Sequence, residues 1–259
     1  MNILFTLCAR AGSKGVKSKN SRVFLGYPLV YYTLSAYQDF IVQYGDKYEQ
    51  IDLALNTDSD LVLEQCKNTR IEFEHILREE KLGGDKVAKA DVIVDTLLKM
   101  ERRKNLQYDI VVDLDLTSPL RTVADIYGCL QTLLNAKETN VVYSVTHSRR
   151  QPYFNMVKKN REGYMERVIK GSFLTRQDAP ECFDMNASIY AYRRNPLLAN
   201  SQNSIFDNKA LAWIMKDTAV LDIDSEEDFE LLQILANYFF ETDEQFKNIK
   251  KNIKNIVKE

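Results

Sequence analysis

The length, composition and charge of this chain are those of a globular protein and exclude several other classes. Its 259 residues are 45% hydrophobic and 28% charged, which suffices for a large α/β core and excludes a disordered chain. The formal net charge of -2 offers no overall basic field to nucleic acid. Residues 24–38 are uncharged but contain Gly, Pro and polar groups, and they fall short of the ~20 apolar residues that cross a bilayer. We therefore expect a cytoplasmic protein that binds neither nucleic acid nor membrane.

Apolar runs of strand length alternate with helical patterns from the first residues onward. This alternation predicts an α/β fold with three αβα layers, in which a mostly parallel sheet is covered by helices on both faces. The expected strands cover residues 2–9, 51–57, 71–77, 108–116 and 140–148. The expected helices cover residues 28–40, a segment that starts at about Asp60, and residues 89–103 and 122–136.

The character of the chain changes between residues 149 and 183, which are charged and aromatic. A turn signal at residues 160–163 lies between two extended stretches, which predicts a β-hairpin arm projecting from the core. Residues 185–194 then return to the sheet. The sequence thus predicts a core made of residues 1–148 and 184–240, with the arm inserted between the two parts.

The last part of the chain predicts a strand and two helical segments. Residues 219–240 read as a final strand followed by a helix, with a capping box from Ser225 to Asp228. The tail, residues 241–259, is expected to form a surface helix that packs on the body or on a partner. One helical stripe among its lysines carries its apolar residues Phe246, Ile249, Ile253 and Ile256.

The loop after the first strand is basic and contains two glycines. ARAGSKGVKSKN, residues 9–20, includes Arg10, Lys14, Lys17 and Lys19 and no acidic residue. Glycines let backbone N–H groups approach an anion, and the cations neutralise it. The loop has neither the GxxxxGK[ST] spacing of a P-loop nor the GxGxxG spacing of a dinucleotide site. It therefore predicts a phosphate site of another kind, although a basic surface turn is the alternative.

A pair of aspartates follows near the end of the expected core. On the expected final strand Asp222 and Asp224 alternate, so their side chains leave the same face about 7 Å apart. Two carboxylates at this separation suit Mg²⁺, and a solvated pair at a strand end is the alternative. A triphosphate needs both features, since cations neutralise its charge and carboxylates hold its metal.

Four motifs in this order resemble the acylneuraminate cytidylyltransferases. They are ARAGSKGVKSKN, LTSPLRT (116–122), NASIY (186–190) and DIDSEEDF (222–229). Members of that family have a Rossmann-like nucleotidyltransferase fold, couple CTP to nine-carbon α-keto acid sugars and release pyrophosphate. VDLDLTSPLRT, RRQPYFNMV and TRQDAPECFDMNASIY are most similar to the branch that makes CMP-N,N'-diacetyllegionaminic acid. The resemblance implies a CTP-dependent enzyme with Mg²⁺ as cofactor, and a homodimer through residues 149–183, possibly assembled into a tetramer by the tail.

The resemblance also implies roles for individual residues. Those expected at the nucleotide are Ala9, Arg10, Ala11, Gly12, Ser13, Lys14, Asn20, Arg78 and Asp85. Those expected to act in catalysis are Arg10, Lys14, Lys19 and Asp224, with Asp222 and Asp224 on the metal. Those expected at the sugar are Asp115, Thr117, Ser118, Arg121, Arg176, Gln177, Asp184 and Asn186. The acceptor of the hydroxyl proton stays open between Lys19 and a metal-bound water.

Two positions depart from the pattern of sialic acid enzymes. Asp115 stands where those enzymes typically carry Gln, and Asp184 stands where they carry Arg. An Asp cannot replace an Arg that binds a substrate carboxylate, but it can accept hydrogen bonds from the N–H of an acylamino group. This favours a diamino sugar such as N,N'-diacetyllegionaminic acid over sialic acid or another nonulosonic acid. Arg121 and Arg149 are the alternatives for the carboxylate contact.

Two other classes fit part of the sequence. VVDLDLT also matches the DxDx[TV] loop of haloacid dehalogenase-type phosphatases, with Asp113 as nucleophile and Asp115 as acid and base. That assignment leaves the basic loop without a role, and in that family the nucleophile lies near the start of the chain. A non-catalytic nucleotide-binding module is the third reading, and it would tolerate loss of Asp222 and Asp224.

Overall fold

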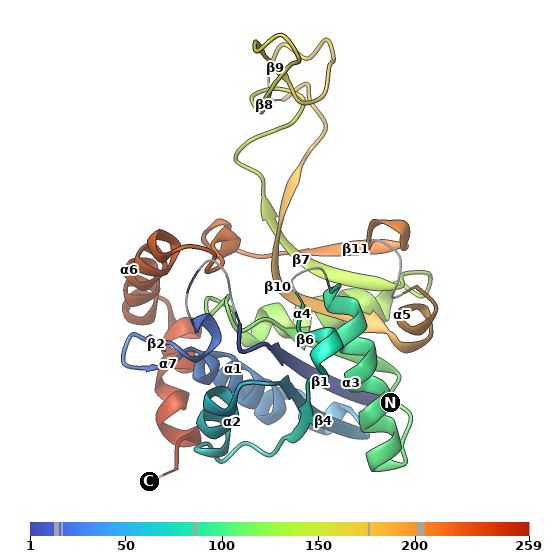
Figure 1. The fold of residues 1–259 in the computed structure, drawn as a ribbon, viewed down its shortest axis with the longest axis vertical. Coiled ribbons are helices and arrows are strands. Elements are labelled where there is room, and N and C mark those ends of the chain that lie inside the picture. Colours follow the sequence, from blue (N-terminus) through green and yellow to red (C-terminus); the bar gives the residue numbers. More distant parts are fainter. Residues whose placement is uncertain (13–15, 17, 85–86, 176, 201–204, 259) are drawn as a thin grey trace.

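The centre of the molecule is a twisted, mostly parallel β-sheet (Figure 1). The computed structural model describes residues 1–259 except 13–15, 17, 85–86, 176, 201–204 and 259. In the described part the sheet has seven strands in the order β11-β7-β10-β6-β1-β4-β5. Only β10 runs antiparallel to its neighbours among these strands. The strands are β1 (Asn2–Ala9), β4 (Gln50–Thr57), β5 (Glu74–Leu77), β6 (Ile110–Leu114), β7 (Val141–His147), β10 (Phe183–Arg193) and β11 (Ala210–Ile214).

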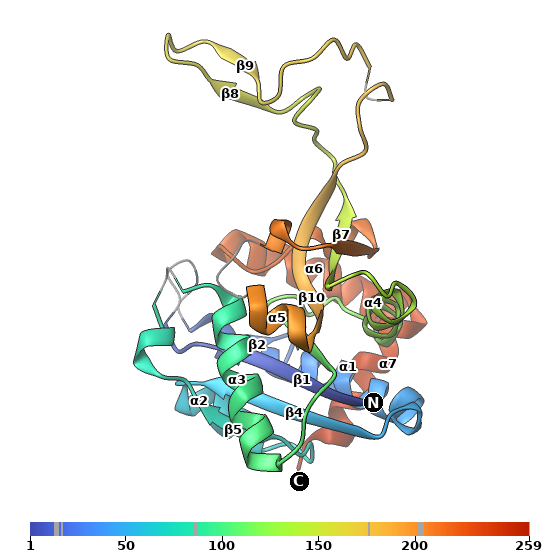
Figure 2. The ribbon, with the colours of Figure 1, turned by 90° about the vertical axis from the view of Figure 1, so that its right-hand side faces the viewer.

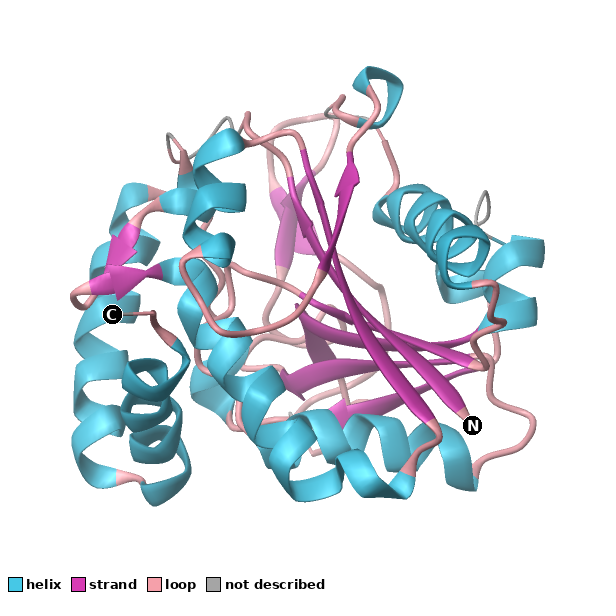
Figure 3. Ribbon diagram, turned by 90° about the horizontal axis from the view of Figure 1, so that it is seen from below, coloured by secondary structure: helices cyan, strands magenta, loops and turns pink. Residues whose placement is uncertain are grey.

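Helices cover both faces of the sheet, as Figure 3 shows. One apolar core lies under α1 (Leu29–Tyr44), α2 (Asp60–Lys67), α4 (Val123–Asn135), α6 (Glu226–Thr242) and α7 (Glu244–Ile256). A second core lies under α3 (Lys89–Lys104) and α5 (Arg194–Asn200) on the opposite face. The fold is therefore the three-layer αβα arrangement that the alternating pattern predicts.

Short elements complete the framework. A two-stranded ribbon, β2 (Val23–Phe24) and β3 (Tyr27–Pro28), precedes α1. The 3-10 turns are η1 (Lys19–Ser21), η2 (Gly45–Lys47), η3 (Glu80–Leu82), η4 (Ile205–Asp207) and η5 (Asp217–Val220). Within the described ranges, no helix combines the length and the apolar character needed to cross a membrane.

The tail helix α7 packs on the body of its own chain. The apolar stripe at Phe246, Ile249, Ile253 and Ile256 is buried, and the Ser35 hydroxyl of α1 donates to the Ile249 carbonyl over 2.6 Å. Helix α1 is apolar around most of its circumference because it lies between the sheet and this helix. The expectation of a tail helix packed on the body is confirmed.

Two strand expectations were wrong, one at the start of the strand and one over its whole length. Strand β5 begins at Glu74 and not at residue 71, because the Arg70 N–H donates to the Ile256 carbonyl and Thr69 pairs with Val257. Residues 219–224 form no strand. The edge of the sheet beside β7 is taken by β11, where we expected no strand, and the Ala219 carbonyl accepts from the Asn186 side chain.

The arm is a hairpin that stands clear of the core (Figures 1 and 2). Its tip consists of β8 (Val157–Lys159) and β9 (Met165–Arg167), joined by a turn in which Gly163 has φ 96°. A positive φ is readily accessible to glycine. Apolar side chains are exposed along the arm, with Leu174 at 84%. The projecting hairpin is confirmed, and its use in dimerisation stays a prediction.

Candidate functional site

The carboxyl ends of β1, β4 and β6 meet at one edge of the sheet, where ligands bind in open parallel sheets. A cavity of about 250 Å³ opens there. It is bounded by the end of β1, the basic loop, the segment from Arg78 through η3, the start of α3 and the loop after β6. Its lining residues are Cys8, Arg10, Lys19, Asn20, Arg78, Leu82, Gly84, Val87, Lys89, Val92, Asp115 and Thr117.

Hydrogen bonds hold the described residues of the basic loop beside this cavity. The Asn20 side chain donates to the Arg10 carbonyl over 3.1 Å, which closes the loop at its two ends. The Ala11 N–H donates to the Asp58 carboxylate over 2.7 Å, so this part of the loop already meets an anionic oxygen. Arg10 donates to the Gly83 carbonyl at 3.4 Å. The predicted residues Ser13, Lys14 and Asp85 lie outside the described residues.

The aspartate pair approaches the basic loop although the two are far apart in sequence. The Lys19 ammonium lies 3.1 Å from the Asp224 carboxylate, across a separation of 205 residues. One turn further along each segment, Arg22 pairs with Glu226 and stacks over the Phe229 ring at 3.9 Å. These contacts fix the loop against the start of α6. The predicted convergence of the cationic and acidic segments is thus present through Lys19.

Asp222 and Asp224 occupy an irregular segment between η5 and α6 and not a strand. Ile223, between them, is fully buried, while Asp224 is exposed. Burial, and next the charge of Asp224, raise the pKa of Asp222 above its usual value. The capping box expected at the start of α6 is confirmed, since Ser225 and Asp228 exchange hydrogen bonds.

This carboxylate pair fits a divalent cation on its own chemistry. Like charges that disfavour one another are relieved by a cation between them, and Mg²⁺ is commonly held by one or two carboxylates together with substrate phosphates. Across the described residues no group of three or more His, Cys, Asp or Glu side chains is arranged to hold a metal. Asp222 and Asp224 could therefore hold Mg²⁺ in this way and not as a closed protein cage.

Lys89 is a cavity residue that sequence reasoning missed. Its ammonium lies 2.7 Å from an oxygen of Asp113 and 2.7 Å from an oxygen of Asp115, and 5.4 Å from the centre of the Tyr190 ring. Lys89 is the first residue of α3, where the positive end of the helix dipole disfavours a cation. That unfavourable position is a sequence signal that could have identified it.

The loop after β6 carries Asp115 on a rigid support. Both the N–H and the hydroxyl of Thr117 donate to the Asp115 carboxylate, over 2.8 and 2.6 Å. Arg121, only 1% exposed, donates to the carbonyls of Asp115 and Ser118. Burial lowers the pKa of Arg121 to about 10. The structure therefore places Arg121 behind the loop and not in the cavity, which corrects its assignment as a direct contact.

The remaining residues predicted at the sugar are dispersed. Asn186 is 2% exposed, and its amide accepts from Ser144 and donates to the Ala219 carbonyl, so it ties β10 to β7 and η5. Asp184 accepts from the Ser148 hydroxyl at the base of the arm. Gln177 belongs to the projecting arm (Figure 2) and is not among the residues that line the cavity. Arg176 lies outside the described residues.

The phosphatase reading is wrong. Asp113 is 0% exposed; one oxygen accepts from the Thr6 hydroxyl over 2.7 Å, and the other faces the Lys89 ammonium. A carboxylate enclosed in this way cannot reach a phosphorus atom in line. Asp113 lies within β6 and is enclosed, whereas Asp115 follows the end of that strand and lines the cavity.

A parallel sheet with a basic loop and an acidic pair at its carboxyl edge defines an α/β enzyme of nucleotide chemistry. The chain belongs to the cytidylyltransferase family, whose model it matches over residues 5–252. The protein is accordingly a nucleotidyltransferase.

The chain is similar to curated proteins, two of them over most of their length. It is 36% identical to post-translational flagellin modification protein B of Campylobacter coli, over 90% of this chain and 94% of that one. It is 35% identical to CMP-N,N'-diacetyllegionaminic acid synthase of Campylobacter jejuni, over 91% and 95%. N-acylneuraminate cytidylyltransferase of Streptococcus agalactiae is 26% identical over 90% of this chain and 52% of that one.

Solved structures share the fold at low identity. A CMP:2-keto-3-deoxy-manno-octonic acid synthetase complexed with CTP superposes with a TM-score of 0.65 at 17% identity, over 92% of this chain and 99% of that one. A 4-diphosphocytidyl-2C-methyl-D-erythritol synthase from Anaerococcus prevotii gives 0.55 at 12% identity, over 91% and 98%. These likenesses show the fold.

Proposed function

We propose that this enzyme transfers CMP from CTP to a nine-carbon α-keto acid sugar and releases pyrophosphate, with N,N'-diacetyllegionaminic acid as the sugar. The observation that carries the proposal is the 3.1 Å contact of Lys19 with Asp224 at the mouth of the cavity, which joins a cationic loop to a metal-competent acid pair. The 35% identity to a protein named as a CMP-N,N'-diacetyllegionaminic acid synthase supports the choice of sugar.

The reaction is a direct displacement at phosphorus. The anomeric 2-hydroxyl attacks the α-phosphorus of CTP, the bond from that phosphorus to the bridging oxygen breaks, and pyrophosphate leaves while the hydroxyl proton passes to a base. No covalent enzyme intermediate is needed. The work of the protein is to align the two substrates and to neutralise the charge that accumulates.

The residues that neutralise charge are the basic loop and the aspartate pair. Arg10 and Lys19 line the cavity and would face the phosphates, together with Lys14 from the same loop. Asp222 and Asp224 would hold Mg²⁺, which when bound screens the triphosphate and polarises its oxygens. Asn20, whose side chain donates to the Arg10 carbonyl, would fix the two ends of the loop beside the nucleotide.

The sugar preference is tested with purified enzyme, CTP and a panel of nonulosonic acids. Mass spectrometry of the CMP-linked product and a pyrophosphate assay are read together. We expect the highest kcat/KM with N,N'-diacetyllegionaminic acid and pyrophosphate release only when CTP and sugar are both present. A preference for plain sialic acid overturns the choice of sugar. Nucleotide binding with no turnover of any sugar in the panel contradicts the proposed reaction and favours a non-catalytic nucleotide-binding module.

A homodimer through the arm is the second part of the proposal. The arm exposes Leu174, Tyr164 and Met165, and apolar area of this kind marks an interaction surface. Residues 149–183 would bring Arg176 and Gln177 of one copy toward the cavity of another. Sedimentation at several concentrations should give a dimer, and replacing Leu174 and Met165 together by Asp should give a monomer with impaired turnover. A wild-type protein that stays monomeric at all concentrations contradicts dimerisation through the arm.

A further inference from the structure

Lys89 begins α3 under conditions that favour a different residue. The helix is preceded by Ala88, whose side chain caps nothing, and its first residue is a cation at the positive end of the helix dipole, although Asp91 supplies an acid in the same turn. Proteins retain unfavourable local choices mainly where function requires them. The surroundings of Lys89 are therefore informative.

The ammonium of Lys89 is shared by two carboxylates on the same strand and its loop. Asp113 and Asp115 lie two residues apart, each with one oxygen 2.7 Å from the Lys89 nitrogen. Asp113 is completely enclosed, whereas the Asp115 side chain is 22% exposed and lines the cavity. Two carboxylates this close repel each other, and the Lys89 ammonium between them offsets that repulsion.

Asp115 is held by three donors and retains one free acceptor position. Thr117 supplies two hydrogen bonds to one oxygen, and Lys89 supplies one to the other oxygen. An ionised carboxylate accepts about four hydrogen bonds, so one direction remains on the oxygen that faces Lys89 and the cavity. The charge of Lys89 and the bonds from Thr117 offset burial and hold the pKa of Asp115 well below its usual range.

We propose that Lys89 is a positioning residue for substrate selection: it holds Asp115 ionised and oriented as an acceptor for an N–H or O–H group of the sugar acid. The inference rests on the proposed function and deepens it. Lys89 neutralises Asp113 and Asp115 and is not itself a phosphate ligand, because its charge is already divided between two carboxylates. The acceptor that results selects a sugar with a donor at this place, such as an acylamino N–H.

Other ionisable groups surround this centre from each packed element. They are Cys8 on β1, Arg78 after β5, Arg121 after β6, Tyr190 and Tyr192 on β10, and Asp222 before α6. Arg121 is the second cation near both carboxylates, but it donates to backbone carbonyls and leaves the carboxylate oxygens to Lys89. Lys89 is thus the direct counter-ion.

The test is a double-mutant cycle with steady-state kinetics for both substrates. Lys89→Met and Asp115→Asn are made singly and together, with Lys89→Arg as the conservative variant and Lys99→Met as the matched control. Lys99 lies on the same helix and also bridges two carboxylates, Glu79 and Asp95, and none of these three residues lines the cavity. Circular dichroism and thermal unfolding confirm that each variant is folded.

Each single variant should raise the KM for the sugar acid about tenfold or more, with the KM for CTP changed less than about twofold. Because Lys89 acts through Asp115, the KM for the sugar acid should be no higher in the double variant than in the more impaired single variant. Lys89→Arg should recover part of the loss, and Lys99→Met should match the wild type. Losses that multiply in the double variant, or a rise confined to the KM for CTP, overturn the inference.

A second measurement separates this inference from the proposed function. Lysine ammonium groups held by carboxylates exchange slowly and are seen by NMR, so Lys89 should give a protected signal that shifts in Asp115→Asn and not in Lys99→Met. If the wild type turns over no nonulosonic acid, the proposed function fails while this signal still tests the pairing. If the wild type turns over the sugar but the Lys89 signal is unchanged in Asp115→Asn, the inference about Lys89 and Asp115 is overturned and the proposed function stands.

Discussion

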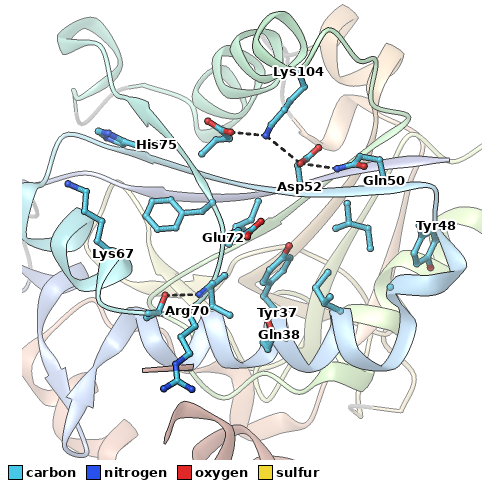
Figure 4. A pocket seen from close by; sticks show the side chains of 18 of the residues that line it. Tyr37, Gln38, Tyr48, Gln50, Asp52, Lys67, Arg70, Glu72, His75 and Lys104 are labelled. Atoms are coloured by element: carbon cyan, nitrogen blue, oxygen red, sulfur yellow. Dashed lines mark hydrogen bonds and ion pairs between the residues drawn. The ribbon is translucent and has the colours of Figure 1, made fainter. Parts of the chain in front are cut away.

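Two of the hollows formed by the described residues differ strongly in size, and the smaller of these two holds the candidate site. A groove of about 1190 Å³ runs along the β4–β5 edge beside α1 (Figure 4). Three of its charged groups pair with each other: Lys104 lies 2.7 Å from Glu74 and 3.9 Å from Asp52, and Asp52 also accepts from Tyr108. The cavity at the carboxyl edge has about 250 Å³. Volume therefore does not locate the site.

The difference lies in where the charged residues come from. The groove draws its pairs from neighbouring strands and helices, and each pair is locally satisfied. The cavity gathers Lys19, Lys89 and Asp115 from a loop, a helix start and a strand end, and brings Asp224 to them from the far end of the chain. Such long-range convergence at unfavourable local positions is characteristic of function.

The largest expected effect is at the cavity on the carboxyl edge of the sheet. Asp224→Ala should lower kcat by about 10²–10³ at saturating Mg²⁺, because it removes a carboxylate from the metal-competent pair and the partner of Lys19. Pyrophosphate release measures the loss, and circular dichroism checks the fold. Glu227→Ala, an exposed acid on the next turn, should stay within about twofold of the wild type. Near-normal turnover of Asp224→Ala would remove the acid pair from the mechanism.

How much the sequence could predict follows the same division. Strand 2–9, the helical patterns and the capping box at Ser225 depend on local periodicity and local hydrogen bonds, and all three are confirmed. No local pattern connects the basic loop with the acid pair. They could be predicted to lie together only because a triphosphate and its metal need both. Their 3.1 Å contact joins the loop after β1 to the irregular segment before α6, and no strand pattern contains it.

The errors came from contacts that no local pattern contains. Residues 219–224 alternate as a strand does, but the Asn186 amide takes the Ala219 carbonyl and β11 takes the sheet edge. The sequence predicts Arg121 as a substrate contact. In the structure Arg121 is 1% exposed and lies behind the loop. Lys89 was overlooked because its partners Asp113 and Asp115 are on another element, and only packing of α3 on the sheet joins them.

A smaller effect contrasts two acids whose pKa values move in opposite directions. Asp115 is held ionised by Lys89, whereas burial on α1, the helix beside the groove, raises the pKa of Asp39 to about 6 from 3.8. The folded state therefore favours neutral Asp39. The contribution of this group to the free energy of unfolding is present in full below pH ~4 and is lost as the pH rises through ~6. Asp39→Asn should raise the free energy of unfolding by about 1 kcal/mol at pH 8, after discounting for partial exposure, and by about 0 at pH 3.5.

Urea unfolding at the two pH values measures this difference. Turnover of Asp39→Asn should equal that of the wild type, since α1 contributes no residue to the lining of the cavity. Equal gains at both pH values would mean that the amide stabilises the helix for a reason unrelated to ionisation. A loss at pH 8 would mean that the ionised form is the one the fold prefers.

The smallest expected effect is at the groove. Lys104→Met removes the ion pairs with Glu74 and Asp52, whose side chains are part-exposed, so the free energy of unfolding should fall by about 0.5–1 kcal/mol. Loss of the Lys104 hydrogen bond should also return the pKa of Glu74 toward its usual value, since that bond is the main cause of its lowering. Turnover and both KM values should stay within about twofold of the wild type. A loss above tenfold in a folded variant would mean that the groove communicates with the carboxyl edge, and the distinction between the two hollows would no longer hold.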